Sequence, residues 1–221
     1  MRTAILIYEG FTSLDATGPF EVLSRLPEAD VVFVSPDGGT VVADQPRFAL
    51  PTVPLAEVTA PVVVVVAGGS TTQRFLEDEE LLGWLRAAHE TTRFTTSVCT
   101  GSLLLGAAGL LQGLPATSHW CELDSLAVFG ATPTSERVVV HDRIITSAGV
   151  SSGIDMALVL ADRLESPEYS QGIQLAIEYD PQPPHDAGSM EKAPEAVAAV
   201  VRAVFDEHYG PSWAQRVADR S

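Results

Sequence analysis

Cysteine is scarce in this 221-residue sequence, in which Cys99 and Cys121 are the only thiols. Two cysteines cannot form the disulfide framework of a secreted domain, so each one is expected to be either a small buried side chain or a reactive thiol. The start of the sequence also lacks a leader pattern, because Met1-Arg2 is followed by an apolar stretch that ends near Tyr8. We therefore expect a cytoplasmic location.

Basic residues and long apolar runs are scarce as well. The 13 Lys and Arg residues face 29 Asp and Glu residues, which gives a formal net charge of −16. Such an acidic balance excludes nucleic acid and anionic membranes as partners, because both select for clustered basic side chains. The longest apolar run, 61–69, is far shorter than the roughly 18 residues that span a bilayer. We expect no membrane segment.

What the sequence does contain is a globular pattern, with 46% hydrophobic residues. Residues 62–66 are five consecutive valines, which is typical of a strand buried on both faces of a parallel sheet. The other expected strands are 3–8, 31–34, 94–98 and a hairpin of 138–140 with 144–146; the expected helices are 19–26, 72–88, 100–111, 151–165, 168–179 and 193–208. This alternation predicts an α/β sandwich with a mostly parallel sheet. With no repeat and no linker, residues 1–221 are expected to form one domain that includes the C-terminal helices at about 193–218.

Cys99 is the strongest candidate for a catalytic residue. It lies between the expected strand 94–98 and the next helix, and Gly101 follows, so the thiol would project from the carboxyl edge of the sheet, where ligands bind in such folds. The start of the helix is expected to lower the thiol pKa and to offer N–H groups to a developing anion. The alternative is an inert buried cysteine. Cys121, beside Trp120, is interpreted as structural.

A competing nucleophile motif occurs at residues 149–153, GVSSG, which matches the G-x-S-x-G elbow of serine hydrolases around Ser151. That mechanism needs an acid and a histidine further along, and only Asp180 or Asp186 with His185 or His208 would serve. The segment after residue 153 is predicted to be plain helices and one proline-rich loop. The motif is therefore interpreted mainly as a turn from strand to helix.

Asp15 and the Gly68-Gly69-Ser70 loop each have two interpretations. Pro19 suits the first position of a helix, which would leave Asp15 before that helix and free to face Cys99. The alternative is that Asp15 is a helix N-cap. The loop, which follows the valines, is either an oxyanion pocket or a turn, and no Gly-Lys-Ser/Thr phosphate motif follows it.

Histidine and metal-ligand patterns are weak. His119 follows Cys99 along the chain, but the spacing does not establish a Cys–His pair, and we expect a supporting role beside the site. The sequence contains no Cys-x-x-Cys and no His-Glu-x-x-His motif, so no metal and no cofactor are predicted.

Several stretches together resemble the ThiJ/PfpI (DJ-type) superfamily, and specifically its isocyanide hydratase branch. The stretches are 97–111 (SVCTGSLLLGAAGLL), 116–120 (ATSHW), 14–22 (LDATGPFEV), 67–69 (AGG), 147–155 (SAGVSSGID) and 173–184 (IQLAIEYDPQPP). The resemblance implies a flavodoxin-like sandwich, a homodimer and a nucleophilic cysteine at a strand–helix elbow. The fold match is more specific than the branch match.

The resemblance also implies a role for individual residues. Cys99 matches the nucleophile and Asp15 its acidic partner, while Thr100 matches the residue that stands beside the cysteine in hydratases. Gly69 and Ser70 fall at the oxyanion turn, Val150 at a pocket wall that carries isoleucine in other hydratases, and His119 at the family's histidine beside the site; these last assignments complete the predicted site.

The implied reaction adds water to an isonitrile, R–N≡C, and gives an N-substituted formamide through a Cys99 thioimidate, with Asp15 handling protons. Its substrates would be small and apolar. The alternatives are a glyoxalase or deglycase that acts on 2-oxoaldehydes with the same cysteine and acid, and a non-catalytic cysteine redox sensor. The sensory domain of a transcription regulator is less expected, because the sequence shows no basic DNA-binding region.

Overall fold

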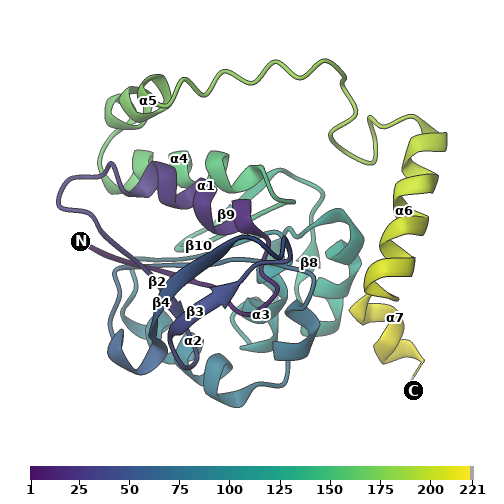
Figure 1. The fold of residues 1–221 in the computed structure, drawn as a ribbon, viewed down its shortest axis with the longest axis horizontal. Helices are drawn as coiled ribbons and strands as arrows, with labels where there is room; N and C mark the ends of the chain where they lie inside the picture. Colours follow the sequence, from purple (N-terminus) through teal and green to yellow (C-terminus); the bar gives the residue numbers. More distant parts are fainter. Residues whose placement is uncertain (220–221) are drawn as a thin grey trace.

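The computed structural model describes residues 1–219 and has an eight-stranded sheet at its centre (Figure 1). In spatial order the strands are β3 (Gly39–Val42), β4 (Ala49–Pro54), β2 (Asp30–Ser35), β1 (Arg2–Leu6), β5 (Val63–Val66), β6 (Phe94–Val98), β10 (Ile144–Ser147) and β9 (Val138–His141). The six strands from β4 to β10 are parallel, and β3 and β9 pair antiparallel at the two edges. The predicted α/β sandwich and the 138–146 hairpin are confirmed.

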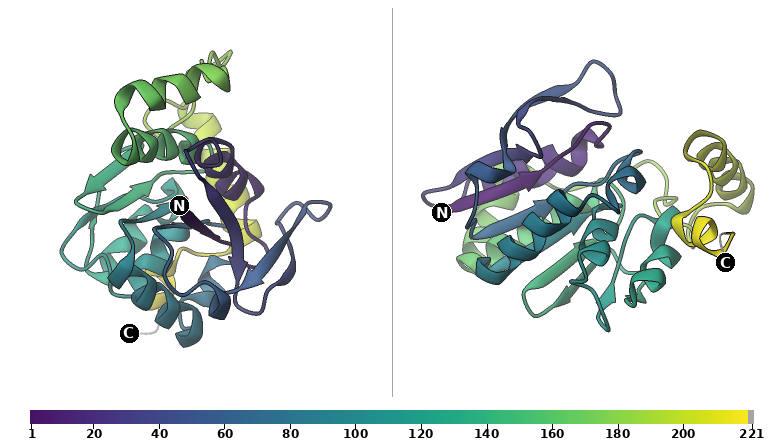
Figure 2. Two further views of the ribbon diagram at one scale, coloured as in Figure 1. Left: turned by 90° about the vertical axis from the view of Figure 1, so that its left-hand side faces the viewer. Right: turned by 90° about the horizontal axis from the view of Figure 1, so that it is seen from below.

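Helices cover both faces of the sheet (Figure 2). Helices α1 (Ser13–Leu23), α4 (Ser152–Leu164) and α5 (Pro167–Ala176) lie on one side, and α2 (Glu79–Thr91) and α3 (Gly101–Ala107) lie on the other. Strand side chains alternate between the two cores: Ile5 packs with the α1 and α4 side, and Leu6 packs with the α2 and α3 side. All four β5 valines are buried, as the unbroken valine run predicts.

Several helix predictions are wrong in their bounds; the predicted helix 100–111, for example, ends at Ala107. Helix α1 begins at Ser13, so Pro19 lies inside it rather than at its start, and Asp15 belongs to its first turn. The proline removes one helical N–H bond, but burial of its neighbours Ala16 and Val22 offsets this loss. The predicted helix 72–88 is divided into the short 3₁₀ helix η2 (Thr72–Phe75) and α2, whose start is capped by the carboxylate of Asp78.

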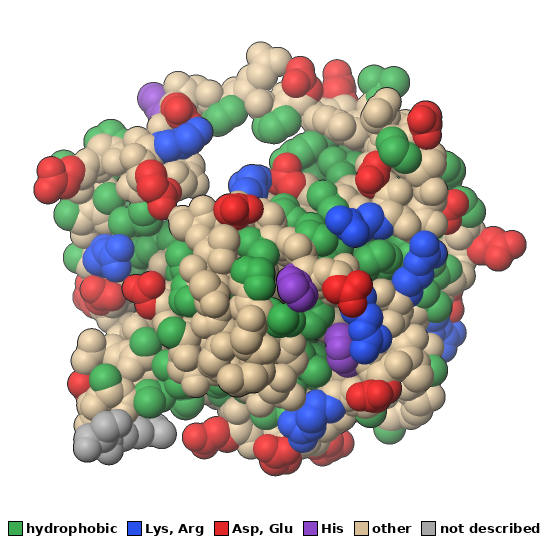
Figure 3. Space-filling model, turned by 180° about the vertical axis from the view of Figure 1, so that it is seen from behind, with side chains coloured by type: hydrophobic (Ala, Val, Ile, Leu, Met, Phe, Trp, Pro, Cys, Tyr) green, Lys and Arg blue, Asp and Glu red, His purple; other side chains and the backbone are tan. Residues whose placement is uncertain are grey.

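After α5, the chain crosses to the opposite side of the molecule (Figure 1). An extended connection leaves α5 and leads to α6 (Glu195–Tyr209) and α7 (Trp213–Ala218), and Figure 3 shows open space between this connection and the body. Helix α7 packs on the 3₁₀ helix η3 (Trp120–Phe129), where the buried carboxylate of Glu122 accepts the N–H of Trp213 at 3.0 Å. The helices that the sequence predicts at about 193–218 are therefore present as α6 and α7.

The remaining short elements are η1 (Leu55–Glu57) and the paired strands β7 (Pro115–Ala116) and β8 (Thr132–Pro133). Within residues 1–219, no helix is both long and apolar enough to cross a membrane.

The carboxyl ends of the parallel strands β1, β5, β6 and β10 meet at one edge of the sheet, and this edge carries the candidate site.

Candidate active site

Cys99 occupies the sharp turn between β6 and α3, as predicted. Its φ of 58° is in the left-handed region, and its N–H is shared between the carbonyls of Ser147 at 3.1 Å and Ala148 at 3.0 Å. Such a conformation is unusual for a residue with a side chain, so the surrounding sheet must hold the turn in place. Gly101 is required here, because a Cβ at this position would collide with the carbonyl oxygen of Val66.

Asp15 reaches the same edge from the first turn of α1, and its side chain is fully buried. Its Oδ2 accepts the N–H of Gly68 at 3.0 Å, while Oδ1 is buried with no hydrogen-bond partner among the described residues. A buried carboxyl oxygen without a partner is costly unless the group is protonated or used in chemistry. The N-cap interpretation is therefore wrong: Thr12 occupies the cap position, and Asp15 faces the site.

Burial raises the pKa of both Asp15 and Cys99. Burial raises the pKa of Asp15 to about 8. Hydrogen bonds from the Gly68 N–H and the Cys99 thiol favour the carboxylate and lower the pKa, but their effect is smaller. Burial, reinforced by the charge of Asp15, also raises the pKa of the Cys99 thiol well above its ordinary value. The N–H groups of Val150 and Thr100 oppose this rise without cancelling it. The expectation that the start of the helix lowers the thiol pKa is therefore wrong, and the pair retains protons at neutral pH.

Val150 contributes its backbone to the site as well as its side chain. It has a φ of 33°, which is strained for a β-branched residue, and its N–H bonds to the Cys99 thiol. Its side chain lines the cavity, as predicted. Beside it, the exposed Ser151 accepts a hydrogen bond from the Arg137 guanidinium at 3.3 Å. No histidine bonds to Ser151 in the described part of the chain, which removes the basis for the serine-hydrolase interpretation.

The N–H groups of both glycines in the loop after β5 are hydrogen-bonded within the protein. The Gly68 N–H bonds to Asp15, and the Gly69 N–H donates to Thr100 Oγ1 at 3.0 Å. The Ser70 hydroxyl, on the exposed side of the loop, donates to the Gly10 carbonyl at 3.3 Å. An anion at this loop would therefore compete with Thr100 for the Gly69 N–H.

His119 forms a pair with Cys121 rather than with Cys99. The Cys121 Sγ lies 2.9 Å from His119 Nδ1, and Nδ1 also accepts the Cys121 N–H at 3.4 Å. Burial lowers the pKa of His119 to about 4, so the ring is neutral, and it stacks on Phe205 with ring centroids 5.4 Å apart. Burial raises the pKa of Cys121 to about 12. Cys121, interpreted from the sequence as structural, lines the cavity beside the predicted site.

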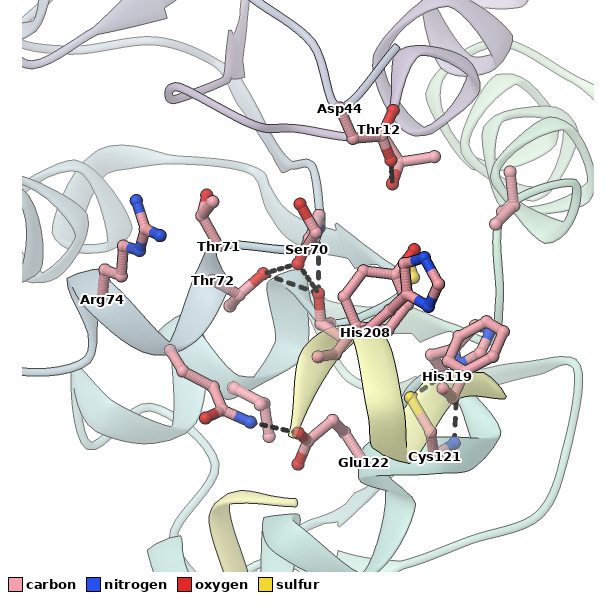
Figure 4. A pocket seen from close by; sticks show the side chains of 18 of the residues that line it. Thr12, Asp44, Ser70, Thr71, Thr72, Arg74, His119, Cys121, Glu122 and His208 are labelled. Atoms are coloured by element: carbon pink, nitrogen blue, oxygen red, sulfur yellow. Dashed lines mark hydrogen bonds between the residues drawn. The ribbon is translucent and has the colours of Figure 1, made fainter. Parts of the chain in front are cut away.

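Most of these groups line one cavity of about 390 Å³, shown in Figure 4. Asp15 is the exception, because it is fully buried next to Cys99 and is not among the lining residues. The lining of the cavity includes Cys99, Thr100, Gly69, Ser70, Val150 and His119 from the predicted site, together with Thr12, Asp44, Thr72, Gln73, Arg74, Glu122, Phe205, His208, Tyr209 and Arg216. The wall formed by α6 and α7 was missed, because local sequence patterns do not show where a distant helix will dock. Among the described residues no cluster of His, Cys, Asp or Glu could hold a metal ion.

Comparisons with known proteins agree with this geometry. Residues 1–163 match the model of the DJ-1/PfpI family. The chain is 40% identical to an isonitrile hydratase from Pseudomonas putida over 202 residues, which are 91% of this chain and 89% of that protein. The crystal structure of a ThiJ/PfpI family protein from Pseudomonas syringae superposes with a TM-score of 0.90 and 38% identity, and covers 94% of this chain and 87% of that one.

A more distant structure shares the fold alone. The crystal structure of Drosophila melanogaster DJ-1beta matches with a TM-score of 0.71 at 21% identity, over 80% of this chain and 97% of that one. The sheet order and the helices on both faces are therefore those of a broad structural family, as the predicted flavodoxin-like sandwich requires.

Proposed function

Because the chain belongs to the DJ-1/PfpI family, we propose that it is an isonitrile hydratase that converts R–N≡C and water into an N-substituted formamide. The observation that carries the proposal is the pairing of Cys99 with a fully buried Asp15 whose pKa is raised to about 8. A carboxyl with a pKa near the working pH both gives and takes protons efficiently. The 40% identity to an isonitrile hydratase over nearly the whole chain supports this reaction class.

In the first step, the Cys99 sulfur bonds to the terminal carbon of the isonitrile. The protonated Asp15 gives its proton to the same carbon, and the thiol proton passes to the Asp15 carboxyl. One S–H bond is lost, one S–C and one C–H bond form, and the product is the thioimidate R–N=CH–S–Cys99. The partnerless Asp15 Oδ1 is the oxygen available for this exchange, because Oδ2 is held by Gly68.

In the second step, water adds to the thioimidate carbon. Asp15 gives its proton to the imine nitrogen and takes one from the water, which leaves a neutral tetrahedral intermediate. The C–S bond then breaks, the hydroxyl proton returns to sulfur through Asp15, and R–NH–CHO leaves. The Val150 and Thr100 N–H groups, which favour the thiolate, stabilise sulfur as the leaving group.

The cavity favours small substrates with an apolar or aromatic substituent. Val150, Leu103 and Phe205 form its apolar part, and the reacting thiol lies among its lining residues. The reaction changes no oxidation state that would require a redox cofactor, and the proposal includes none. The family resemblance further supports a homodimer, and the scarcity of cysteine supports a cytoplasmic location.

The test is to incubate the purified protein with an aryl isonitrile and, separately, with methylglyoxal. Formation of the formamide is followed by its formyl proton signal in NMR, and formation of lactate is followed in the second assay. We expect formamide with the wild type and Cys121→Ser, and none with Cys99→Ser. Lactate without formamide would replace the proposal with the 2-oxoaldehyde alternative, and neither product would contradict both enzyme assignments.

A further inference from the structure

A chain of three hydroxyl groups runs from the buried core to the cavity. The Thr100 Oγ1 lies 2.6 Å from the Thr72 Oγ1, which in turn lies 2.7 Å from the Tyr8 hydroxyl. Tyr8 and Thr72 are each about 1% exposed, whereas Thr72 and Thr100 both line the cavity. Burial raises the pKa of Tyr8 above its ordinary value, so all three groups are neutral hydroxyls with one proton each.

Backbone partners determine where these protons go. Thr72 lies 2.8 Å from the Gly69 carbonyl, whereas Thr100 lies 3.3 Å from the same oxygen, so the Thr72 proton belongs to Gly69. Tyr8 donates to the Ala67 carbonyl at 2.9 Å or to Thr72. The Thr72 oxygen, having given its proton to Gly69, is left with lone pairs as the acceptor for Thr100.

The consequence appears at Thr100. Its proton is directed to Thr72, and one of its lone pairs accepts the Gly69 N–H at 3.0 Å. The second lone pair remains available to the cavity. Thr100 therefore presents a hydrogen-bond acceptor to whatever molecule lies beside Cys99.

We propose that Thr72 is a positioning residue that fixes the Thr100 hydroxyl as an acceptor, and that this acceptor orients the water that attacks the thioimidate. This inference rests on the proposed hydratase function and assigns a role to a residue outside the Cys99–Asp15 pair. The water donates one hydrogen bond to Thr100 and loses its other proton to Asp15, so its oxygen lone pair is directed at the carbon. Attack by Cys99 in the first step needs no such acceptor.

The test compares Thr72→Val, which keeps the shape and removes the hydroxyl, with Thr72→Ser, which keeps the hydroxyl. Thr92→Val is the matched control, because Thr92 and Thr95 form a buried hydroxyl pair at 2.8 Å, at the end of β6 away from Cys99. For each variant, kcat and KM are measured on one aryl isonitrile. The Cys99 adduct is followed by rapid quench and intact-protein mass spectrometry, and folding by thermal melting.

We expect Thr72→Val to lower kcat by about 10- to 100-fold, the size expected when a reacting group is misplaced. KM should fall in parallel, so that kcat/KM changes little, because the step before the thioimidate is not affected. The thioimidate should form at the wild-type rate and then accumulate, because only its hydrolysis is slowed. Thr72→Ser should restore kcat to within about threefold, and Thr92→Val should change melting but not kcat. Accumulation of an adduct is a result that a purely structural role for Thr72 does not produce.

Two results would overturn the inference and are distinct from a failure of the proposed function. If the wild type forms formamide and Thr72→Val does so at the same kcat, the acceptor at Thr100 is not needed. If Thr72→Val slows formation of the adduct rather than its hydrolysis, Thr72 serves the first step instead. If the wild type forms no formamide, the proposed function itself is contradicted, and the positioning role of Thr72 is then contradicted as well. Should Thr72→Val fail to fold, an inactive but folded Thr72→Ser would equally contradict the proposal.

Discussion

Replacing Asp15 by asparagine changes both catalysis and the pH dependence of stability. The native carboxyl has a pKa of about 8, whereas an unfolded aspartate has a pKa of about 3.9. Between these values the folded state binds one more proton than the unfolded state. Raising the pH therefore destabilises the wild type, and this effect begins near pH 4 and is complete above pH 8.

The size of the effect follows from the same pKa difference. Each pH unit in this window lowers the free energy of unfolding by about 1.4 kcal/mol. Titration of Asp15 therefore lowers the free energy of unfolding by about 2.5 kcal/mol between pH 5 and pH 7. For a chain of this size that loss corresponds to about 5–10 °C in melting temperature. Asparagine keeps an acceptor for the Gly68 N–H and does not titrate, so Asp15→Asn should lack this contribution.

The assay is thermal melting of the wild type and Asp15→Asn at pH 5, 6 and 7. The difference between the two proteins cancels other groups, including the buried His119, whose lowered pKa makes stability rise with pH in both. Asp78→Asn is the control, because Asp78 is a capping aspartate outside the cavity. Identical pH dependence of melting in wild type and Asp15→Asn would refute the raised pKa. Turnover should fall about 10²- to 10⁴-fold in Asp15→Asn, and full activity would remove Asp15 from the mechanism.

The geometry of the Cys99 turn predicts the reactivity of the thiol and the effect of replacing Gly101, and the family resemblance predicts the oligomeric state. The rate at which iodoacetamide alkylates Cys99 should rise about tenfold per pH unit from pH 7 to 9, because the pKa of the thiol is raised. Peptide mass spectrometry measures this rate, and a plateau below pH 8 would contradict the raised pKa. Gly101→Ala should lower the free energy of unfolding by about 1–3 kcal/mol in chemical denaturation, because the new Cβ would clash with the Val66 carbonyl. Gly172→Ala should have no such effect, because the space around Gly172 is open. Equal stability of the two variants would contradict the close approach at Gly101. Light scattering should give about twice 23.5 kDa, and a monomer at micromolar concentration would contradict the homodimer.

Strong local patterns predicted most of the fold. The valine run is typical of a strand with both faces buried, which is what β5 is, and Phe94–Val98 has the bounds that were expected. Pro19 misled the prediction of α1, because proline favours the start of a helix while tertiary packing of that helix tolerates it inside. The break between η2 and α2 was missed, although Asp78 is a good capping residue and carried the signal for it.

The site was predicted where it depends on the ends of neighbouring strands. Cys99 and Val150 follow β6 and β10, which pair in parallel, so their proximity is a consequence of the topology. The cavity wall from Phe205 and Tyr209 depends on docking of α6, which no local pattern encodes. The direction of the Cys99 pKa was also missed, because burial is a property of the folded chain and outweighs the two N–H groups beside the sulfur.

The proposed mechanism requires Cys99 to form a covalent bond to the isonitrile carbon during turnover. Its most direct test is rapid acid quench of the wild type with an aryl isonitrile labelled with ¹³C at the terminal carbon, followed by mass spectrometry of the Cys99 peptide. We expect a transient adduct on Cys99 with the mass of the labelled isonitrile, which decays as labelled formamide appears, and no adduct on Cys121. Labelled formamide formed at an undiminished rate by Cys99→Ala would contradict the covalent role of Cys99.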